Sequence, residues 1–190
     1  MLEAPAWQPP AELLDFLHVG PPPVYVGFGS IAGRDPAGTA ETVVRALAQA
    51  GQRGVLATGW GGLELAGLPD TIFKLESASH DRLFPHMAAV VHHGGAGTTA
   101  AGLRAGKPTV VCPFFGDQPF WGARVAALGV GPKPIPQRLL TADTLAPAIR
   151  RAVTDVRTQS RAHELGVKLR TEVGAVRAVE VLELYLTAAR

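Results

Sequence analysis

The sequence predicts an α/β fold: a Rossmann-like, doubly wound parallel sheet with a helical C-terminal tail. Three observations support this prediction. Short, continuous apolar runs alternate with helix-like segments over residues 24–130, which is typical of parallel strands buried on both faces. The chain has 22 Gly and 16 Pro among 190 residues, and they mark most of the expected turns. Beyond Thr141 the pattern is helical only.

The composition excludes several classes of protein. Apolar residues make up 47% and charged residues 18%, which favours a large core over disorder. The single Cys112 cannot form an internal disulfide. No apolar run approaches the roughly 20 residues needed to cross a bilayer, and the N-terminus does not resemble a signal peptide, so we expect a soluble, cytoplasmic protein. A net charge of +2, carried by scattered cations, does not indicate a nucleic-acid partner.

The elements follow in order along the chain. Residues 1–23 are proline-rich, with one short helix between two proline groups, and are predicted to be an inter-domain linker segment. Residues 24–190 are predicted to form the folded domain, whose first C-terminal helix has Thr141 as its N-cap. The expected strands span 24–28, 54–57, 71–75, 88–91 and 109–112, with a last short strand at 130–132. The expected helices span 36–50, a turn at 80–86, 96–105 and 117–128.

Ligands bind at the carboxyl ends of strands in an open α/β sheet, so the turns after strands carry the chemistry. The first such turn, residues 27–33, reads G-x-G-x-x-A. No acidic residue ends the next strand, which disfavours a nicotinamide dinucleotide and leaves a simple tight turn as the alternative. Ser30 still suits a phosphate oxygen. The turn is not a nucleophile elbow, because Phe28 stands where that motif has its first glycine.

The second turn, residues 92–99, is the most informative. Its glycines allow close backbone approach, and the helix that follows offers free N–H groups and a positive dipole end, with the Thr98 hydroxyl as a further donor. A diphosphate is the natural occupant. Neighbouring residues of a strand point to opposite faces, so His92 and His93 cannot both face one ligand, and one of them is expected to be structural.

The third turn ends in Asp117 and Gln118, where a helix begins. Asp117 is either an N-cap or, with Gln118, a ligand for sugar hydroxyls. A metal site is not expected. Four histidines cluster in sequence, but no cysteine or acidic residue lies at a zinc-like spacing from them. The four are His80, His86, His92 and His93.

These turns together resemble the signature segment of inverting nucleotide-sugar glycosyltransferases with the GT-B fold. The similarity is greatest to the sterol and lipid glucosyltransferase branch and its bacterial relatives. It covers essentially the whole chain and is carried by residues 24–30, 58–63, 92–99, 104–108 and 113–121.

The resemblance implies one half of a GT-B fold, the domain that binds the donor, usually UDP-glucose. By position, the residues that it assigns to the diphosphate are Ser30, His93, Gly95, Gly97 and Thr98, and those that it assigns to the hexose are Asp117 and Gln118. Ser77 stands in place of the tryptophan that stacks on the base in plant-type members. Base recognition therefore falls to the backbone near Ala78, with Trp60 either stacking on the base or packing its own loop. Ala101 replaces the glutamate that binds the ribose.

The implied reaction moves a hexose with inversion to a hydroxyl of an apolar acceptor such as a sterol or lipid, with no cofactor or metal. The resemblance places the general base and the acceptor in an N-terminal domain to which nothing in this sequence corresponds. No catalytic residue is therefore assigned, and the 190 residues alone are expected to transfer little or nothing. The expected partners are the UDP-sugar, that N-terminal domain and, through it, the acceptor; peripheral membrane association of a full-length enzyme is compatible with this. The alternatives are a non-catalytic nucleotide-sugar binding module and a sugar-nucleotide epimerase-like domain.

Overall fold

The computed structural model describes residues 7–29, 35–58 and 67–188. Its five strands form one parallel sheet in the order β3-β2-β1-β4-β5. The order reverses between β1 and β4, and such a reversal opens a crevice at the carboxyl ends of the two strands. The predicted fold class is confirmed. The strands are β1 (Val24–Gly27), β2 (Gly54–Ala57), β3 (Ile72–Leu75), β4 (Ala89–His92) and β5 (Thr109–Val111).

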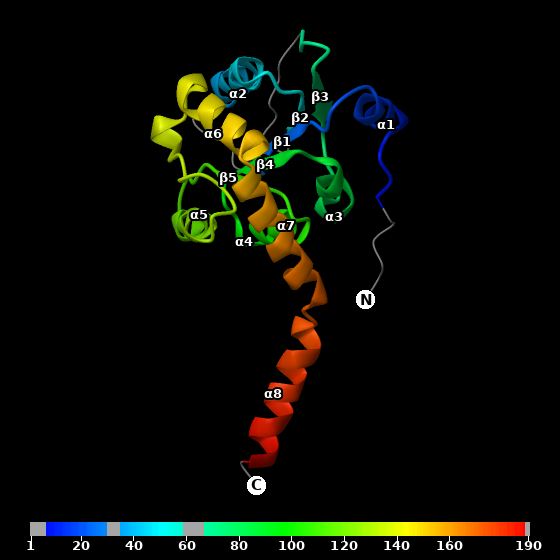
Figure 1. Cartoon of the computed structure of the whole chain (residues 1–190), viewed down its shortest axis with the longest axis vertical. Helices are drawn as coiled ribbons and strands as arrows, with labels where there is room; N and C mark the ends of the chain where they lie inside the picture. Colours follow the sequence, from blue (N-terminus) through cyan, green and yellow to red (C-terminus); the bar gives the residue numbers. More distant parts are fainter. Residues whose placement is uncertain (1–6, 30–34, 59–66, 189–190) are drawn as a thin grey trace.

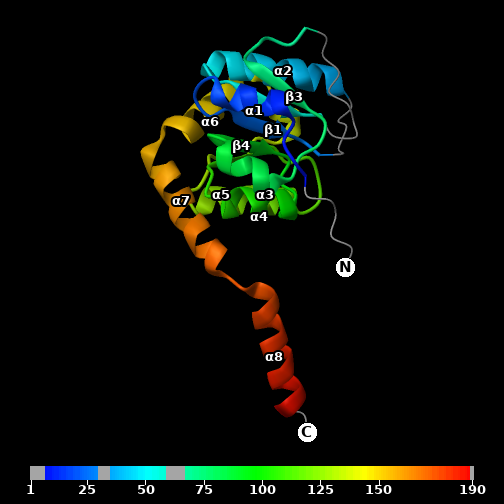
Figure 2. The same cartoon turned by 90° about the vertical axis from the view of Figure 1, so that its right-hand side faces the viewer.

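Helices cover both faces of the sheet, with α2 and α6 on one face and α3, α4 and α5 on the other (Figures 1 and 2). Helix α7 runs down the side of the domain, and α8 projects away from it. The α-helices are α1 (Ala11–His18), α2 (Pro36–Ala50), α3 (His80–Leu83), α4 (Ala96–Arg104), α5 (Gln118–Ala127), α6 (Ala142–Thr154), α7 (Val156–Thr171) and α8 (Gly174–Ala188). The part of the chain that the structure describes also contains the 3-10 turns η2 (Phe84–His86) and η3 (Gln137–Leu139).

The strands are apolar throughout because both of their faces are buried. In β1, Val24 and Val26 belong to the core shared with α2 and α6, whereas Tyr25 between them packs on the opposite side with Leu83 and Phe84. The same alternation continues in β4, where Val91 faces the first core and Val90 the second. A two-sided core of this kind fixes the position of each strand end, and so of the turns that follow.

One expectation differs from the structure. The strand predicted at 130–132 is wrong. The Thr109 N–H donates to the Val130 carbonyl at 3.0 Å, but the pairing does not continue, because Pro132 has no N–H to donate. The proline-rich N-terminal segment contributes to the core, since Leu13 of α1 is fully buried. Its role as an inter-domain linker stays a prediction.

Candidate functional site

The switch point between the ends of β1 and β4 is built around the His93 imidazole. The strand ends that flank it are in register, with Gly27 of β1 opposite His92 of β4. A Cβ placed on Gly29 would lie 3.2 Å from His93 Cε1, and one on Gly95 would lie 2.6 Å from His93 Nε2. Gly29 also has a positive φ of 69°. These two glycines are therefore needed to admit the ring itself, in addition to any ligand.

His93 is half-buried, and its surroundings shift its pKa. Burial lowers its pKa, while the Gly27 backbone and then the Asp117 carboxylate act in the opposite direction. Nδ1 is buried and makes no hydrogen bond of good geometry with a described residue. At neutral pH the ring is thus uncharged, and a bound anion would favour its protonation.

His92 is a structural residue. It is fully buried, and its Nδ1 accepts a hydrogen bond from the Gly94 N–H at 2.9 Å, which places the ring proton on Nε2. Burial, followed by the charges of His93 and His80, lowers its pKa to about 3. The ring therefore stays neutral and fixes the turn that leads into α4. This supports the prediction that one histidine of the pair is structural.

The start of α4 is open to an anion. Gly95 is the N-cap residue, and no side chain caps the helix within the described residues. Thr99 Oγ1 donates inward to the Gly95 carbonyl at 2.9 Å, whereas Gly97 is exposed with open space where a Cβ would stand. The N–H groups of Gly97 and Thr98 have no partner within the helix, so they can donate to a ligand at its positive end.

Asp117 and Gln118 lie on the turn after β5, and neither acts as a simple cap. Asp117 occupies the N-cap position, but its exposed carboxylate accepts from Trp121 Nε1 at 2.8 Å instead of capping α5. Gln118 is buried, and its Oε1 accepts from the N–H groups of Phe114 and Phe115 at 2.7 and 3.1 Å. The Gln118 oxygen is therefore occupied, and only its amide nitrogen remains to donate to a ligand.

The remaining predicted site residues do not lie on the turns after β4 and β5. Ser77 is exposed and Ala78 half-buried in the loop between β3 and α3. Ser30 and Trp60 lie outside the described residues, so their predicted roles are not placed. Within the ranges that the structure describes, no group of three His, Cys, Asp or Glu side chains is arranged to hold a metal ion.

Sequence reasoning missed a contact behind the site. The Tyr25 hydroxyl and His80 Nε2 lie 3.3 Å apart, and the His80 ring stacks on Phe84 with centroids 4.5 Å apart. Burial raises the pKa of Tyr25 to about 12, so its hydroxyl stays protonated. In sequence Tyr25 is only one more apolar residue of a core strand, and no local signal indicates a partner 55 residues away.

The fold is that of known glycosyltransferases. A glycosyltransferase of kitacinnamycin has 27% sequence identity and a TM-score of 0.74, over 96% of this chain and 46% of that one. CalG4, the calicheamicin glycosyltransferase, shares the fold with a TM-score of 0.76 at 24% identity, over 97% of this chain and 46% of that one. The architecture is thus one half of a GT-B glycosyltransferase.

Sequence comparison defines the family. Residues 55–180 match the Erythromycin biosynthesis protein CIII-like, C-terminal domain, and the chain belongs to this family. A sterol 3-beta-glucosyltransferase of Arabidopsis thaliana is 46% identical over 185 residues, and one of Aspergillus oryzae is 42% identical over 189 residues. These matches cover 97% and 93% of this chain but only 29% and 13% of the two relatives. The predicted resemblance is confirmed.

No helix within the described ranges is long and apolar enough to span a membrane.

Proposed function

We propose that this chain is the donor-binding domain of an inverting glycosyltransferase that takes glucose from UDP-glucose and transfers it to a hydroxyl of an apolar acceptor such as a sterol. The observation that carries the proposal is the uncapped start of α4 beside the glycine-enclosed His93 at the switch point. The sterol glucosyltransferase relatives support the hexose and the acceptor class.

The proposed role of the site is to stabilise the negative charge of the leaving diphosphate. When the bond to the anomeric carbon breaks, the diphosphate leaves with additional negative charge. The free N–H groups of Gly97 and Thr98 and a protonated His93 would stabilise that charge, and donors fixed in advance are most effective at this step. We infer that the reaction needs no metal, since these groups supply the positive potential. Asp117, held by Trp121, would accept from the hexose hydroxyls while the Gln118 amide donates to them.

The chain spans less than a third of the length of the two sterol 3-beta-glucosyltransferases above, so a complete reaction is proposed for a longer enzyme. An N-terminal domain of that enzyme would hold the acceptor and the general base. The 190 residues alone would bind UDP and UDP-glucose but transfer little or no sugar.

Two variants test the proposal by calorimetric titration with UDP and UDP-glucose. His93→Ala should weaken both ligands by about tenfold or more, because it removes a donor to the shared diphosphate. Asp117→Ala should leave UDP unchanged and weaken UDP-glucose by about tenfold. Asp70→Ala, an exposed carboxylate before β3 at the opposite edge of the sheet, is the matched control and should change neither.

The alternatives give different results. Absence of binding at millimolar UDP-glucose would contradict the proposal. Equal losses of UDP affinity in both variants would show that the hexose position is misassigned. Binding without transfer, even when the chain is joined to an acceptor domain, would indicate a binding module. Release of an epimerised sugar without acceptor would indicate an epimerase.

A further inference from the structure

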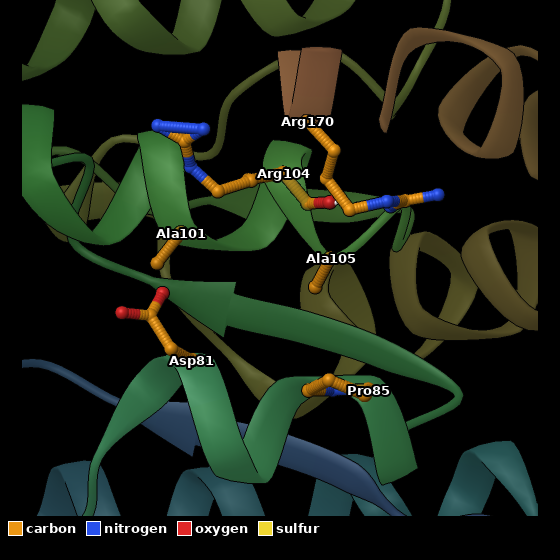
Figure 3. A pocket seen from close by; sticks show the side chains of 6 residues that line it. All are labelled: Asp81, Pro85, Ala101, Arg104, Ala105 and Arg170. Atoms are coloured by element: carbon orange, nitrogen blue, oxygen red, sulfur yellow. Dashed lines mark hydrogen bonds between the residues drawn. The ribbon is translucent and has the colours of Figure 1, made fainter. Parts of the chain in front are cut away.

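A cavity of about 330 Å³ lies between α3 and α4, beside the proposed nucleotide site. Figure 3 shows Asp81 of α3 and Ala101 of α4 facing one another across it. Its lining also includes Pro85, Arg104, Ala105 and Arg170 of α7. The cavity therefore combines a small apolar wall with one carboxylate and two cations.

The two cations of this cavity are already engaged. Arg104 Nη1 donates to the Leu169 carbonyl at 3.0 Å, and Arg170 Nη1 donates to the Arg104 carbonyl at 2.7 Å, so the pair ties the end of α4 to the end of α7. Asp81, by contrast, is exposed and makes no ion pair or hydrogen bond with another described residue. Its carboxylate keeps its full capacity to accept hydrogen bonds from a ligand.

The cavity lies where a nucleoside would have to cross from one helix to the other. The proposed base contacts, Ser77 and Ala78, lie three and two residues before α3, and the proposed phosphate donors lie in the first turn of α4. Ala101 is four residues beyond Gly97 and so lies on the same side of α4, one turn further along. The sugar that links base to diphosphate must pass between the start of α3 and this turn. Asp81 lies there, three residues after Ala78.

We propose that Asp81 binds the ribose of the donor nucleotide, its carboxylate accepting hydrogen bonds from the 2′- and 3′-hydroxyls. This inference rests on the proposed function. Ala101 is too short to reach a hydroxyl, and the neighbouring His80 is turned to the core, where its Nε2 meets the Tyr25 hydroxyl. Hydrogen bonds to a charged acceptor are about twice as strong as neutral ones, so Asp81 would select ribonucleotides over nucleotides that lack the hydroxyls.

The test compares UDP with 2′,3′-dideoxyuridine diphosphate by calorimetry on the 190-residue chain. Wild type should bind UDP about tenfold to a hundredfold more tightly than the dideoxy ligand. Asp81→Ala should remove this preference by weakening UDP, while the dideoxy ligand binds equally well or slightly more tightly because a negative charge near the diphosphate is gone. Asp70→Ala should keep the preference. Since Asp81 is exposed, the melting temperature should not change.

The outcomes separate this inference from the proposed function. If Asp81→Ala retains the wild-type preference, or weakens both ligands equally, the ribose assignment is overturned while UDP binding stands. If wild type binds both ligands equally, no residue reads the hydroxyls and the assignment is again overturned. If wild type binds neither ligand, the proposed function fails, and this inference fails with it.

Discussion

At the scale of single residues, adjacent histidines have opposite roles because their surroundings differ. His92 is fully buried and held neutral by burial, with the Gly94 N–H as its partner. His93, one residue on, is only half-buried and lies at the switch point with Asp117 near enough to oppose the lowering of its pKa. Strand alternation predicts that the two side chains diverge, but not which of them is the structural one.

His92 gives a prediction about stability and pH. His92→Ala should lower the free energy of unfolding by about 2–4 kcal/mol at pH 7, because it leaves a cavity and an unpaired Gly94 N–H. The folded-state pKa is about 3, below the unfolded value of 6.5. As pH falls below 6.5, the unfolded wild-type chain therefore binds a proton that the folded chain does not. Through this group the free energy of unfolding of the wild type falls by up to about 1.4 kcal/mol for each pH unit below 6.5, whereas that of the variant does not change in this way.

The difference in the free energy of unfolding between wild type and His92→Ala should consequently become smaller from pH 7 to pH 5 in urea unfolding experiments. A difference that stays constant over this range would contradict a buried, neutral His92. His18→Ala, an exposed histidine on α1, should change stability by no more than about 0.5 kcal/mol at pH 7. UDP affinity should fall less in His92→Ala than in His93→Ala.

At the scale of elements, the ends of helices and strands follow local chemistry. Helix α2 ends where Gly51 adopts a left-handed φ of 66°, and α6 begins with Thr141 in a reciprocal capping box with Thr144. Both boundaries were predictable because the residues that set them are adjacent in sequence. The strand expected at 130–132 is absent for a reason that is also local, because Pro132 has no N–H to continue the pairing that Val130 begins with Thr109.

Gly131 provides the corresponding prediction. A Cβ at this position would lie 1.9 Å from the Thr109 carbonyl oxygen, which is backbone in β5 and cannot move without disturbing the sheet. Gly131→Ala should therefore cost at least about 3 kcal/mol or prevent folding, as seen by thermal and urea unfolding. Gly174→Ala, at the start of α8, meets nothing within 4 Å and should be neutral or stabilising by up to about 1 kcal/mol. Equal effects of the two substitutions would contradict this packing.

The candidate site was predictable to the same extent. The turns at 92–99 and 113–118 could be recognised in the sequence because glycines and polar residues follow the ends of predicted strands there. The structure brings both turns to one edge of the sheet. Three details depended on contacts between distant elements: the enclosure of His93 by Gly29, the hydrogen bond between Tyr25 and His80, and the cavity between Asp81 and Ala101. Each joins residues from distant parts of the sequence, which no local pattern reveals.

At the scale of the whole molecule, α8 stands apart from the domain. It projects away from the sheet in both views (Figures 1 and 2). Val179, Leu182 and Leu186 lie on one side of this helix by their spacing, and they are 54%, 62% and 69% exposed. By comparison, Leu145 of α6 is fully buried against α2 and the sheet. The apolar face of α8 therefore adds little to the stability of the 190-residue chain.

Two matched substitutions test this division. Leu182→Glu with Leu186→Glu should leave the melting temperature and UDP affinity unchanged, because neither side chain contributes to the core or the site. Leu145→Glu should unfold the domain, since it buries an unpaired charge. An exposed apolar face favours self-association, so wild type should become oligomeric with rising concentration in sedimentation velocity, whereas the double variant should stay monomeric. A large fall in melting temperature of the double variant would mean that α8 folds back onto the domain in solution. A wild type that stays monomeric at all concentrations would show that this face does not mediate self-association.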